Sequence, residues 1–333
     1  MSLPAILRRS FPSRRFRPRR VWAVSLALVA LVALVALVGG ADGADGAEDG
    51  WQRHAPLPQP RTEVAAAVTG DRIVVVGGFA ASGANSARAD VYSIPENRWG
   101  RLPSLPVAVD HAAAAAAQGR VYVLGGYGSD RRPLRTAFVL ERGSWRRLAR
   151  LPEPRAAAAA AVTGGRLYVL GGVEERGGLA RISLVLNLAT GRWSRAPGPT
   201  GREHLAAAAA NGRVYAVGGR SAGYDTNTRA FEAYEPATRR WSRLPRLPSA
   251  RGGTGAAVVS GQLVSIGGEA PSGTIAGVYA FDLRARRWRR LPDLPTPRHG
   301  LGVVAHGDRV YAVAGGPQPG LTTSGVLESL RIR

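Results

Sequence analysis

Arginine recurs at one position of a repeated pattern in this sequence, and its chemistry suits the binding of anions. A guanidinium group binds carboxylate or phosphate through two parallel hydrogen bonds, so several such groups around one opening would form an anion-binding ring. Alternatively, each arginine pairs with a nearby carbonyl or acid and orders its own loop. The recurring residues are Arg61, Arg155, Arg202, Arg251 and Arg298, and Val109 occupies the sixth position.

Two histidines and a glutamate stand two residues after this position, at His111, His204 and Glu63. His299 is one residue out of that register. Imidazole and carboxylate groups together can bind a metal or exchange protons. The sequence does not show whether side chains from different repeats converge, so we predict no metal site and no cofactor and assign no catalytic residue. We place Glu63, His111 and His204 with the arginines on one candidate ligand-binding face.

These side chains belong to six internal repeats. Each repeat has a hydrophobic segment that ends in a glycine pair, and successive pairs are 46 to 49 residues apart. The pairs are Gly77-Gly78, Gly125-Gly126, Gly171-Gly172, Gly218-Gly219, Gly267-Gly268 and Gly315-Gly316. A tryptophan recurs with the same period at Trp51, Trp99, Trp145, Trp193, Trp241 and Trp288. Seven residues before five of these tryptophans stands an apolar residue: Tyr92, Phe138, Leu186, Tyr234 and Phe281.

From these motifs the segment 51–333 resembles the Kelch-repeat family. The resemblance implies an all-β, six-bladed β-propeller, in which each repeat forms a four-stranded blade. It places the glycine pair after the second strand, the apolar residue on the third and the tryptophan on the fourth. In similar adaptor proteins, the loops after the glycine pair and the loops that enter the next blade form the ligand-binding face. Arginines similar to those above line an acidic-peptide pocket there.

The positions of the tryptophans predict how the ring closes. Trp51 precedes the first glycine pair, and no tryptophan follows the sixth. We therefore expect residues 51–55 to supply the outer strand of the last blade and residues 326–332 to supply its third strand.

Three alanine runs favour helix by intrinsic propensity, but each falls at the first strand of a blade. The runs are Ala112–Ala117, Ala156–Ala161 and Ala206–Ala210. Because six first strands converge on the propeller axis, only small side chains fit there, and we expect strands.

The longest loops after the glycine pairs are candidates for specificity or are ordinary solvated loops. They span residues 79–90, 173–181 and 220–227 and carry Glu174, Glu175, Tyr224 and Asp225.

The composition excludes some chemistry. The chain has no cysteine, so disulfides, thiolate ligands and the Cys–Tyr copper site of galactose-oxidase-type Kelch enzymes are impossible. All 45 basic residues are arginine, and from Trp51 onward 38 arginines stand against 19 acids, a net charge of +19. Such a field attracts anions, but a coding bias toward arginine is the favoured explanation, because net charge speaks to solubility and non-specific binding more than to function.

The N-terminus carries a targeting signal. Residues 1–20 contain seven arginines, residues 21–38 form an apolar run broken only by Ser25, and residues 39–50 are rich in glycine, alanine and acids. An 18-residue helix just spans the hydrocarbon core. The arginines remain in the cytoplasm, so we expect the propeller outside the membrane. The run is either a single-span anchor or a signal peptide cleaved after Ala41.

Three functions fit the sequence. The first is a monomeric, non-enzymatic binding module at the cell envelope that holds a protein or an anionic ligand. The second is a sugar-acting enzyme similar to the exported Kelch mutarotases of acidic sugars. The third is a basic scaffold that rests on anionic lipids or wall polymers. We expect no nucleic-acid partner, because the domain lies outside the cell and lacks a nucleic-acid-binding motif.

Overall fold

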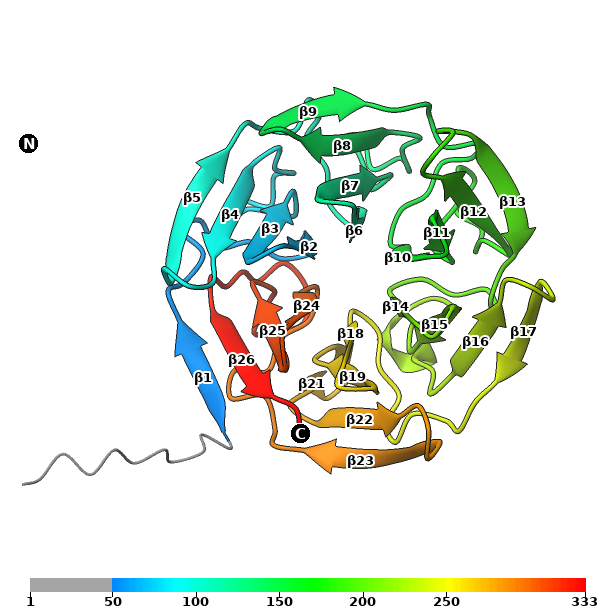
Figure 1. Cartoon of the computed structure of the whole chain (residues 1–333). Helices are drawn as coiled ribbons and strands as arrows, with labels where there is room; N and C mark the ends of the chain where they lie inside the picture. Colours follow the sequence, from blue (N-terminus) through cyan, green and yellow to red (C-terminus); the bar gives the residue numbers. More distant parts are fainter. Residues whose placement is uncertain (1–49) are drawn as a thin grey trace, which may run out of the picture. The chain divides into compact units, whose positions relative to one another are not determined.

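The computed structural model describes residues 50–333, which form six four-stranded antiparallel sheets arranged around an axis (Figure 1). This all-β architecture confirms the six-bladed propeller. No helix among the residues described is long and apolar enough to cross a membrane. The expected apolar helix at 21–38 and the arginine-rich segment before it lie outside the described residues.

Blades 1 to 3 follow the chain in order. Blade 1 contains β2 (Ala65–Thr69), β3 (Arg72–Val76), β4 (Ala89–Ser93) and β5 (Arg98–Leu102). Blade 2 contains β6 (Ala113–Ala117), β7 (Arg120–Leu124), β8 (Ala137–Glu141) and β9 (Ser144–Arg147). Blade 3 contains β10 (Ala159–Thr163), β11 (Arg166–Leu170), β12 (Ile182–Asn187) and β13 (Trp193–Pro197).

Blades 4 to 6 complete the ring. Blade 4 contains β14 (Ala206–Ala210), β15 (Arg213–Val217), β16 (Phe231–Glu235) and β17 (Arg240–Arg243), with the short 3-10 helix η1 (Tyr224–Thr226) between β15 and β16. Blade 5 contains β18 (Gly255–Val259), β19 (Gln262–Ile266), β22 (Val278–Asp282) and β23 (Arg287–Leu291), with the hairpin β20 (Glu269–Ala270) and β21 (Gly273–Thr274) between β19 and β22. Blade 6 contains β24 (Gly302–His306), β25 (Arg309–Val313), β26 (Leu327–Arg331) and β1 (Trp51–His54).

The two ends of the described chain close the ring within blade 6. β1 pairs antiparallel with β26, with Trp51 opposite Leu330 and His54 opposite Leu327. The outer edge of β26 is therefore covered, which removes a free strand edge from the last blade. In Figure 1 the blue β1 lies beside the red β26.

The alanine runs contribute to first strands as expected from their place in the repeat, although only Ala159–Ala161 of the run Ala156–Ala161 lie in β10. β6 and β14 consist of five alanines each, and with β2, β10, β18 and β24 they are the innermost strands (Figure 1). A cavity of about 260 Å³ lies along the axis and is lined by alanine and valine side chains of these six strands. Larger side chains would collide at the axis, so packing overrides helix propensity here.

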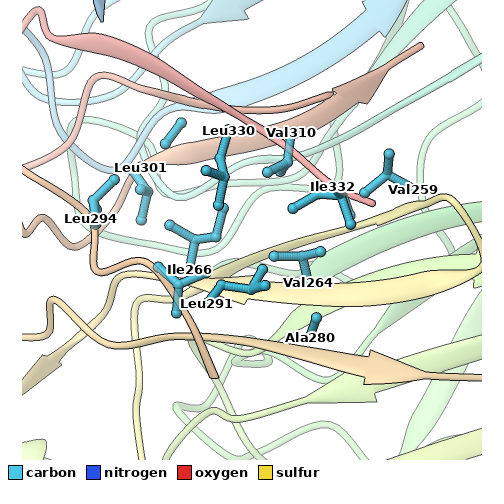
Figure 2. Packing of buried hydrophobic residues seen from close by; sticks show 13 residues of the cluster. Val259, Val264, Ile266, Ala280, Leu291, Leu294, Leu301, Val310, Leu330 and Ile332 are labelled. Atoms are coloured by element: carbon cyan, nitrogen blue, oxygen red, sulfur yellow. The ribbon is translucent and has the colours of Figure 1, made fainter. Parts of the chain in front are cut away.

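The hydrophobic core lies between blades. Six clusters of buried side chains each join two neighbouring blades. Figure 2 shows the cluster between blades 5 and 6, where Val264 and Ile266 of β19 face Val310 of β25 and Leu330 of β26. A single blade buries little by itself, so each sheet depends on its neighbours for stability.

The recurring tryptophans join neighbouring blades on the outside of the ring. Each of the six in the described residues donates its indole N–H to a backbone carbonyl of the preceding blade, at 2.8 to 3.0 Å. Trp51 extends this pattern across the closure, because it donates to the carbonyl of Pro292.

The hairpin turns and the blade-to-blade loops lie on opposite faces of the propeller. Each blade is an antiparallel meander, so the turn between its first and second strands and the turn between its third and fourth strands lie on the same face. The loops after the glycine pairs and the loops that enter the next blade share the other face, which we call the loop face. At Gly126 the loop face requires glycine: φ is +94°, and a Cβ would lie 2.7 Å from the carbonyl oxygen of Asp110.

Candidate functional site

The five recurring arginines are buried beneath the loop face. Arg61 is fully buried; its Nη1 donates to the carbonyls of Gly77 at 3.0 Å and Arg88 at 2.7 Å, and its Nη2 pairs with Asp90. Arg298 donates to the carbonyl of Ala314 at 2.8 Å and to Glu328 Oε2 at 2.7 Å.

Two more of the recurring arginines bind in the same way. Arg202 donates to the carbonyl of Gly218 at 2.7 Å and pairs with Glu232. Arg251 donates to the carbonyl of Gly267 at 3.1 Å and to Ser249 Oγ at 2.7 Å.

Arg155 is also buried, with 1% of its surface exposed. It donates to the carbonyl of Pro154 and to Glu153 Oε2, both at 2.9 Å, and lies 3.4 Å from Glu174 Oε1.

The five recurring arginines are therefore buried and bound to nearby loops, which is the alternative to an anion-binding ring that the sequence left open. The physical reason is local. In four of the five blades an arginine nitrogen donates to the carbonyl 16 residues later, which belongs to the first glycine of the pair or to the residue directly before it. These four arginines therefore order the loop that follows the glycine pair. Val109 occupies the sixth position with 1% exposure and packs in the hydrophobic cluster between blades 1 and 2.

One residue from each blade, two positions after the recurring arginine or, in one blade, after Val109, belongs to a closed ring of backbone hydrogen bonds around the axis. Each of these six residues has a φ between +50° and +65°. Each backbone N–H after the first donates to the carbonyl of the preceding member at 2.9 to 3.1 Å, and Val64 N–H closes the circle on Gly300 at 3.2 Å. The members are Glu63, His111, Ala157, His204, Gly253 and Gly300.

The three polar members of this ring converge. His111 Nε2 lies 3.0 Å from His204 Nε2 and 3.3 Å from Glu63 Oε2. All three ligand atoms lie within 4.8 Å of one another. The sequence identified these residues but not their convergence, which arises because the ring is narrow and the other three members, Ala157, Gly253 and Gly300, have a small side chain or none. A space of about 120 Å³ is lined by the six ring residues and by the residue that follows each of them.

A second layer of carboxylates lies behind the histidines. Asp110 Oδ1 bonds to Nδ1 of His111, and Glu203 Oε1 lies 3.2 Å from Nδ1 of His204. Two arginines in turn hold these acids. Arg131 donates to Asp110 Oδ2 at 2.9 Å, and Arg220 donates to Glu203 Oε1 at 3.1 Å.

His299 also reaches the cluster, although it is one residue out of register. Its Nε2 lies 3.6 Å from both Glu63 Oε1 and Glu269 Oε2, and its Nδ1–H donates to the carbonyl of Gly316 at 3.1 Å. Glu269 is 2% exposed; its Oε1 accepts from Arg220 at 2.8 Å, whereas its Oε2 accepts no hydrogen bond from the described residues.

The electrostatics follow from this packing. Burial raises the pKa of Glu63, but the facing charges, led by those of His111 and His204, outweigh burial and lower the pKa to about 2. Burial also lowers the pKa of His111, but Glu63 and Asp110 overcome it and the net shift is upward. The pKa of His204 is lowered, chiefly by burial. Two imidazoles in contact cannot both carry a charge cheaply, so their pKa values move apart.

Above the ring the loop face is hollowed into a pocket of about 400 Å³. Arg131 lies over the rings of Tyr127 at 4.5 Å and Phe79 at 5.2 Å, and Arg220 lies 5.0 Å from the ring centre of Tyr224. The rim carries Tyr224, 38% exposed, and Leu321, 62% exposed. These are the two exposed large hydrophobic residues among residues 50–333.

The sequence analysis did not single out several residues at this site, although they occupy equivalent positions in the repeats. Phe79, Tyr127, Arg220 and Glu269 each directly follow a glycine pair. Asp110 and Glu203 directly follow the arginine position and pair with Tyr127 and Arg220 as isolated β-bridges.

The four loop residues proposed for specificity have different places. Tyr224 lines the pocket, and Glu174 lies beside Arg155. Glu175 and Asp225 are exposed to solvent.

Comparisons with known proteins agree with this fold. A family model described as the KLHDC2/KLHL20/DRC7 Kelch-repeats domain matches residues 110–316, and a Kelch motif model matches residues 60–106. Among solved structures, one titled "Structure of YjhT" is similar with a TM-score of 0.73 and 16% sequence identity, covering 82% of this chain and 95% of that chain. At this identity the likeness shows the fold alone.

Proposed function

This chain belongs to the Kelch-repeat β-propeller family, and we propose that it is a non-enzymatic protein-binding module whose partner docks on the loop face. One observation carries the proposal. The two exposed large hydrophobic residues, Tyr224 and Leu321, both lie on the rim of the pocket that has Glu63, His111 and His204 at its base. An apolar rim around buried polar groups is typical of a binding site, where apolar contacts give affinity and polar groups give specificity.

The chemistry of the pocket favours a protein segment over a free anion. Four carboxylates surround the base, namely Glu63, Asp110, Glu203 and Glu269, and they already neutralise Arg131 and Arg220. The recurring arginines, from which we expected an anionic ligand, are buried. A partner segment that covers Tyr224 and Leu321 and inserts a polar side chain fits these features.

Site-specific photo-crosslinking in the full chain tests this proposal. The photoreactive residue is placed at Leu321, and in a control at Arg284, an exposed residue of the β22–β23 turn on the opposite face. We expect one defined protein adduct from Leu321, none from Arg284, and loss of the first adduct in Tyr224→Ala. Equal adducts from both positions, or none from Leu321, would reject the loop face as the docking site.

We further propose that the propeller lies outside the cytoplasmic membrane, either anchored by residues 21–38 or released by cleavage. The support is the apolar run itself, the seven arginines before it and the acidic linker after it. A reporter enzyme that is active only after export, fused to the C-terminus, should be active, and deletion of residues 21–38 should abolish that activity.

A sugar-acting enzyme is the second candidate. It is supported by two imidazoles at the base of an open pocket beside Arg131, whose side chain is 53% exposed. Such an enzyme needs a carboxylate-binding arginine and an acid–base group. Faster anomerisation of an acidic sugar, followed by NMR, supports this candidate, and unchanged rates across a panel of sugars retire it.

A basic scaffold is the third candidate, supported by exposed arginines on the outermost strands. Examples are Arg98 of β5, Arg146 of β9 and Arg240 of β17. Binding to anionic vesicles that disappears with added salt and shows no preference among headgroups would favour it.

A further inference from the structure

We propose that Glu63, His111 and His204 form a binding site for one divalent transition-metal ion, with a coordination position open to the pocket. The ligand atoms are one carboxylate oxygen of Glu63 and the Nε2 atoms of both histidines. This inference goes beyond protein binding, and metal binding alone tests it.

Two of the three distances between ligand atoms fit a common metal, and the third pair lies within 4.8 Å. Zinc–nitrogen and zinc–oxygen bonds of roughly 2.0–2.2 Å place ligand atoms roughly 2.8–3.1 Å apart at octahedral angles and roughly 3.3–3.6 Å apart at tetrahedral angles. His111 Nε2 lies 3.0 Å from His204 Nε2 and 3.3 Å from Glu63 Oε2. Two nitrogen lone pairs directed at one another repel, so either one of these nitrogens carries a hydrogen that it donates to the other, or a cation lies between them.

The groups behind the ligands support the metal over a proton. A metal-binding histidine generally directs its other ring nitrogen at a carboxylate or carbonyl, which fixes the ring and leaves the remaining lone pair for the metal. Asp110 bonds to His111 Nδ1, and Glu203 lies 3.2 Å from His204 Nδ1. His111 therefore has this arrangement in full, whereas the buried Nδ1 of His204 has a carboxylate nearby but accepts or donates no hydrogen bond among the described residues.

The local charge also favours a cation. The described domain is strongly basic, yet the carboxylates of Glu63, Asp110, Glu203 and Glu269 gather here around only two arginines. Glu269 Oε2 is buried without a hydrogen bond from the described residues and faces His299 at 3.6 Å. Buried charges are generally paired or bound to metals, and one divalent ion would compensate this excess.

The backbone holds the ligands in place at some cost. Non-glycine residues rarely adopt positive φ, yet Glu63, His111 and His204 all have φ near +50°. Such strain concentrates at functional sites because the surrounding structure must enforce it. The hydrogen-bonded backbone ring supplies that enforcement, and the small residues Ala157, Gly253 and Gly300 leave room for the three larger side chains.

The ligand types select the metal class. Two imidazoles and one carboxylate suit zinc, nickel, copper or iron better than magnesium or calcium, which prefer oxygen ligands. Three protein ligands with an open position are also the pattern of catalytic zinc, in which water or a substrate occupies the fourth place.

The test is a calorimetric titration of the purified full chain, in mild detergent and stripped with a chelator, with zinc chloride. A parallel titration with cobalt chloride follows visible absorption, which reports the coordination geometry. We expect one ion per chain and cobalt bands typical of nitrogen and oxygen ligands. His111→Gly and His204→Gly should weaken binding by at least about 100-fold, since each removes a direct ligand.

Glycine is the chosen replacement because Gly253 and Gly300 already occupy the equivalent positions, so the backbone ring should persist. Circular dichroism and thermal unfolding verify the fold of each variant. His306→Ala is the matched control, because His306 also faces a carboxylate, Asp71 at 2.8 Å, but lies outside the cluster. No zinc binding by the wild-type chain, or equal affinity in all four proteins, would overturn the proposal and leave a metal-free hydrogen-bonded cluster.

Discussion

His111 and His204 are 93 residues apart in the sequence, yet their Nε2 atoms lie 3.0 Å apart at the mouth of the propeller channel. His111 precedes blade 2 and His204 precedes blade 4, so the two histidines are not neighbours in the ring. Blade 3 lies between them and contributes only Ala157 at the same position. A large side chain there would keep the imidazoles apart. The small residue of one blade therefore permits the contact between two others.

We predict that the carboxylates behind the histidines tune metal affinity without providing ligands. Asp110→Asn and Glu203→Gln should each weaken zinc binding by roughly 10- to 100-fold, the usual effect of losing such a partner. Competition with a chelating dye measures this. Glu235→Gln is a suitable control, because Glu235 pairs with Arg213 at 2.8 Å on the outside of blade 4. Unchanged zinc affinity in Asp110→Asn and Glu203→Gln would show that these two acids do not influence metal binding.

The buried arginines should contribute to stability according to their partners. Arg298→Met leaves Glu328 buried without its main cation, so we expect a loss of roughly 3–5 kcal/mol in the free energy of unfolding. The double variant with Glu328→Leu should recover much of this loss. Arg251 donates to a carbonyl and a hydroxyl instead, so Arg251→Met should cost less. Urea denaturation measures all three, and equal losses at Arg298 and Arg251 would contradict this explanation.

The glycine pairs should resist substitution where backbone approaches closely. In Gly126→Ala the new Cβ would lie 2.7 Å from the Asp110 carbonyl at a φ of +94°. Gly143 has a φ of +78° but nothing within 4 Å of a Cβ, so Gly143→Ala isolates the cost of φ alone. We expect both to destabilise and Gly126→Ala to do so by at least about 1 kcal/mol more. Melting temperatures of the two variants measure this difference. Similar values would show that the Asp110 backbone moves away from the new Cβ at little cost.

The strand that closes the ring should weaken in mild acid. Burial, assisted by the charge of Arg309, lowers the pKa of His54 below its ordinary 6.5. The unfolded chain therefore binds this proton first, so stability falls as the pH drops below about 6.5 toward the folded-state pKa. His54→Gln should remove this part of the pH dependence. Unfolding free energies between about pH 7 and about pH 5 test this, and parallel curves for both proteins would refute it.

The propeller architecture could be predicted from the sequence alone, because it is a repeated local pattern. Glycine pairs, tryptophans and the apolar residues before them recur with one period, and each has the same packing role in every blade. The position of Trp51 before the first glycine pair also indicated the closure, in which β1 pairs with β26. Periodic features of this kind can be predicted from sequence, because the same contacts repeat.

Which polar residues converge at the pocket could be read only from the folded ring. Arg155 and His111 occupy repeat positions only two residues apart, in different blades. The arginine side chain nevertheless binds its own loop, whereas the histidine side chain turns toward the axis. The site is built from departures from the repeat: a glutamate, two histidines and three small residues at one position of six blades. Distances across the axis depend on how the whole ring closes, and local sequence patterns do not contain that information.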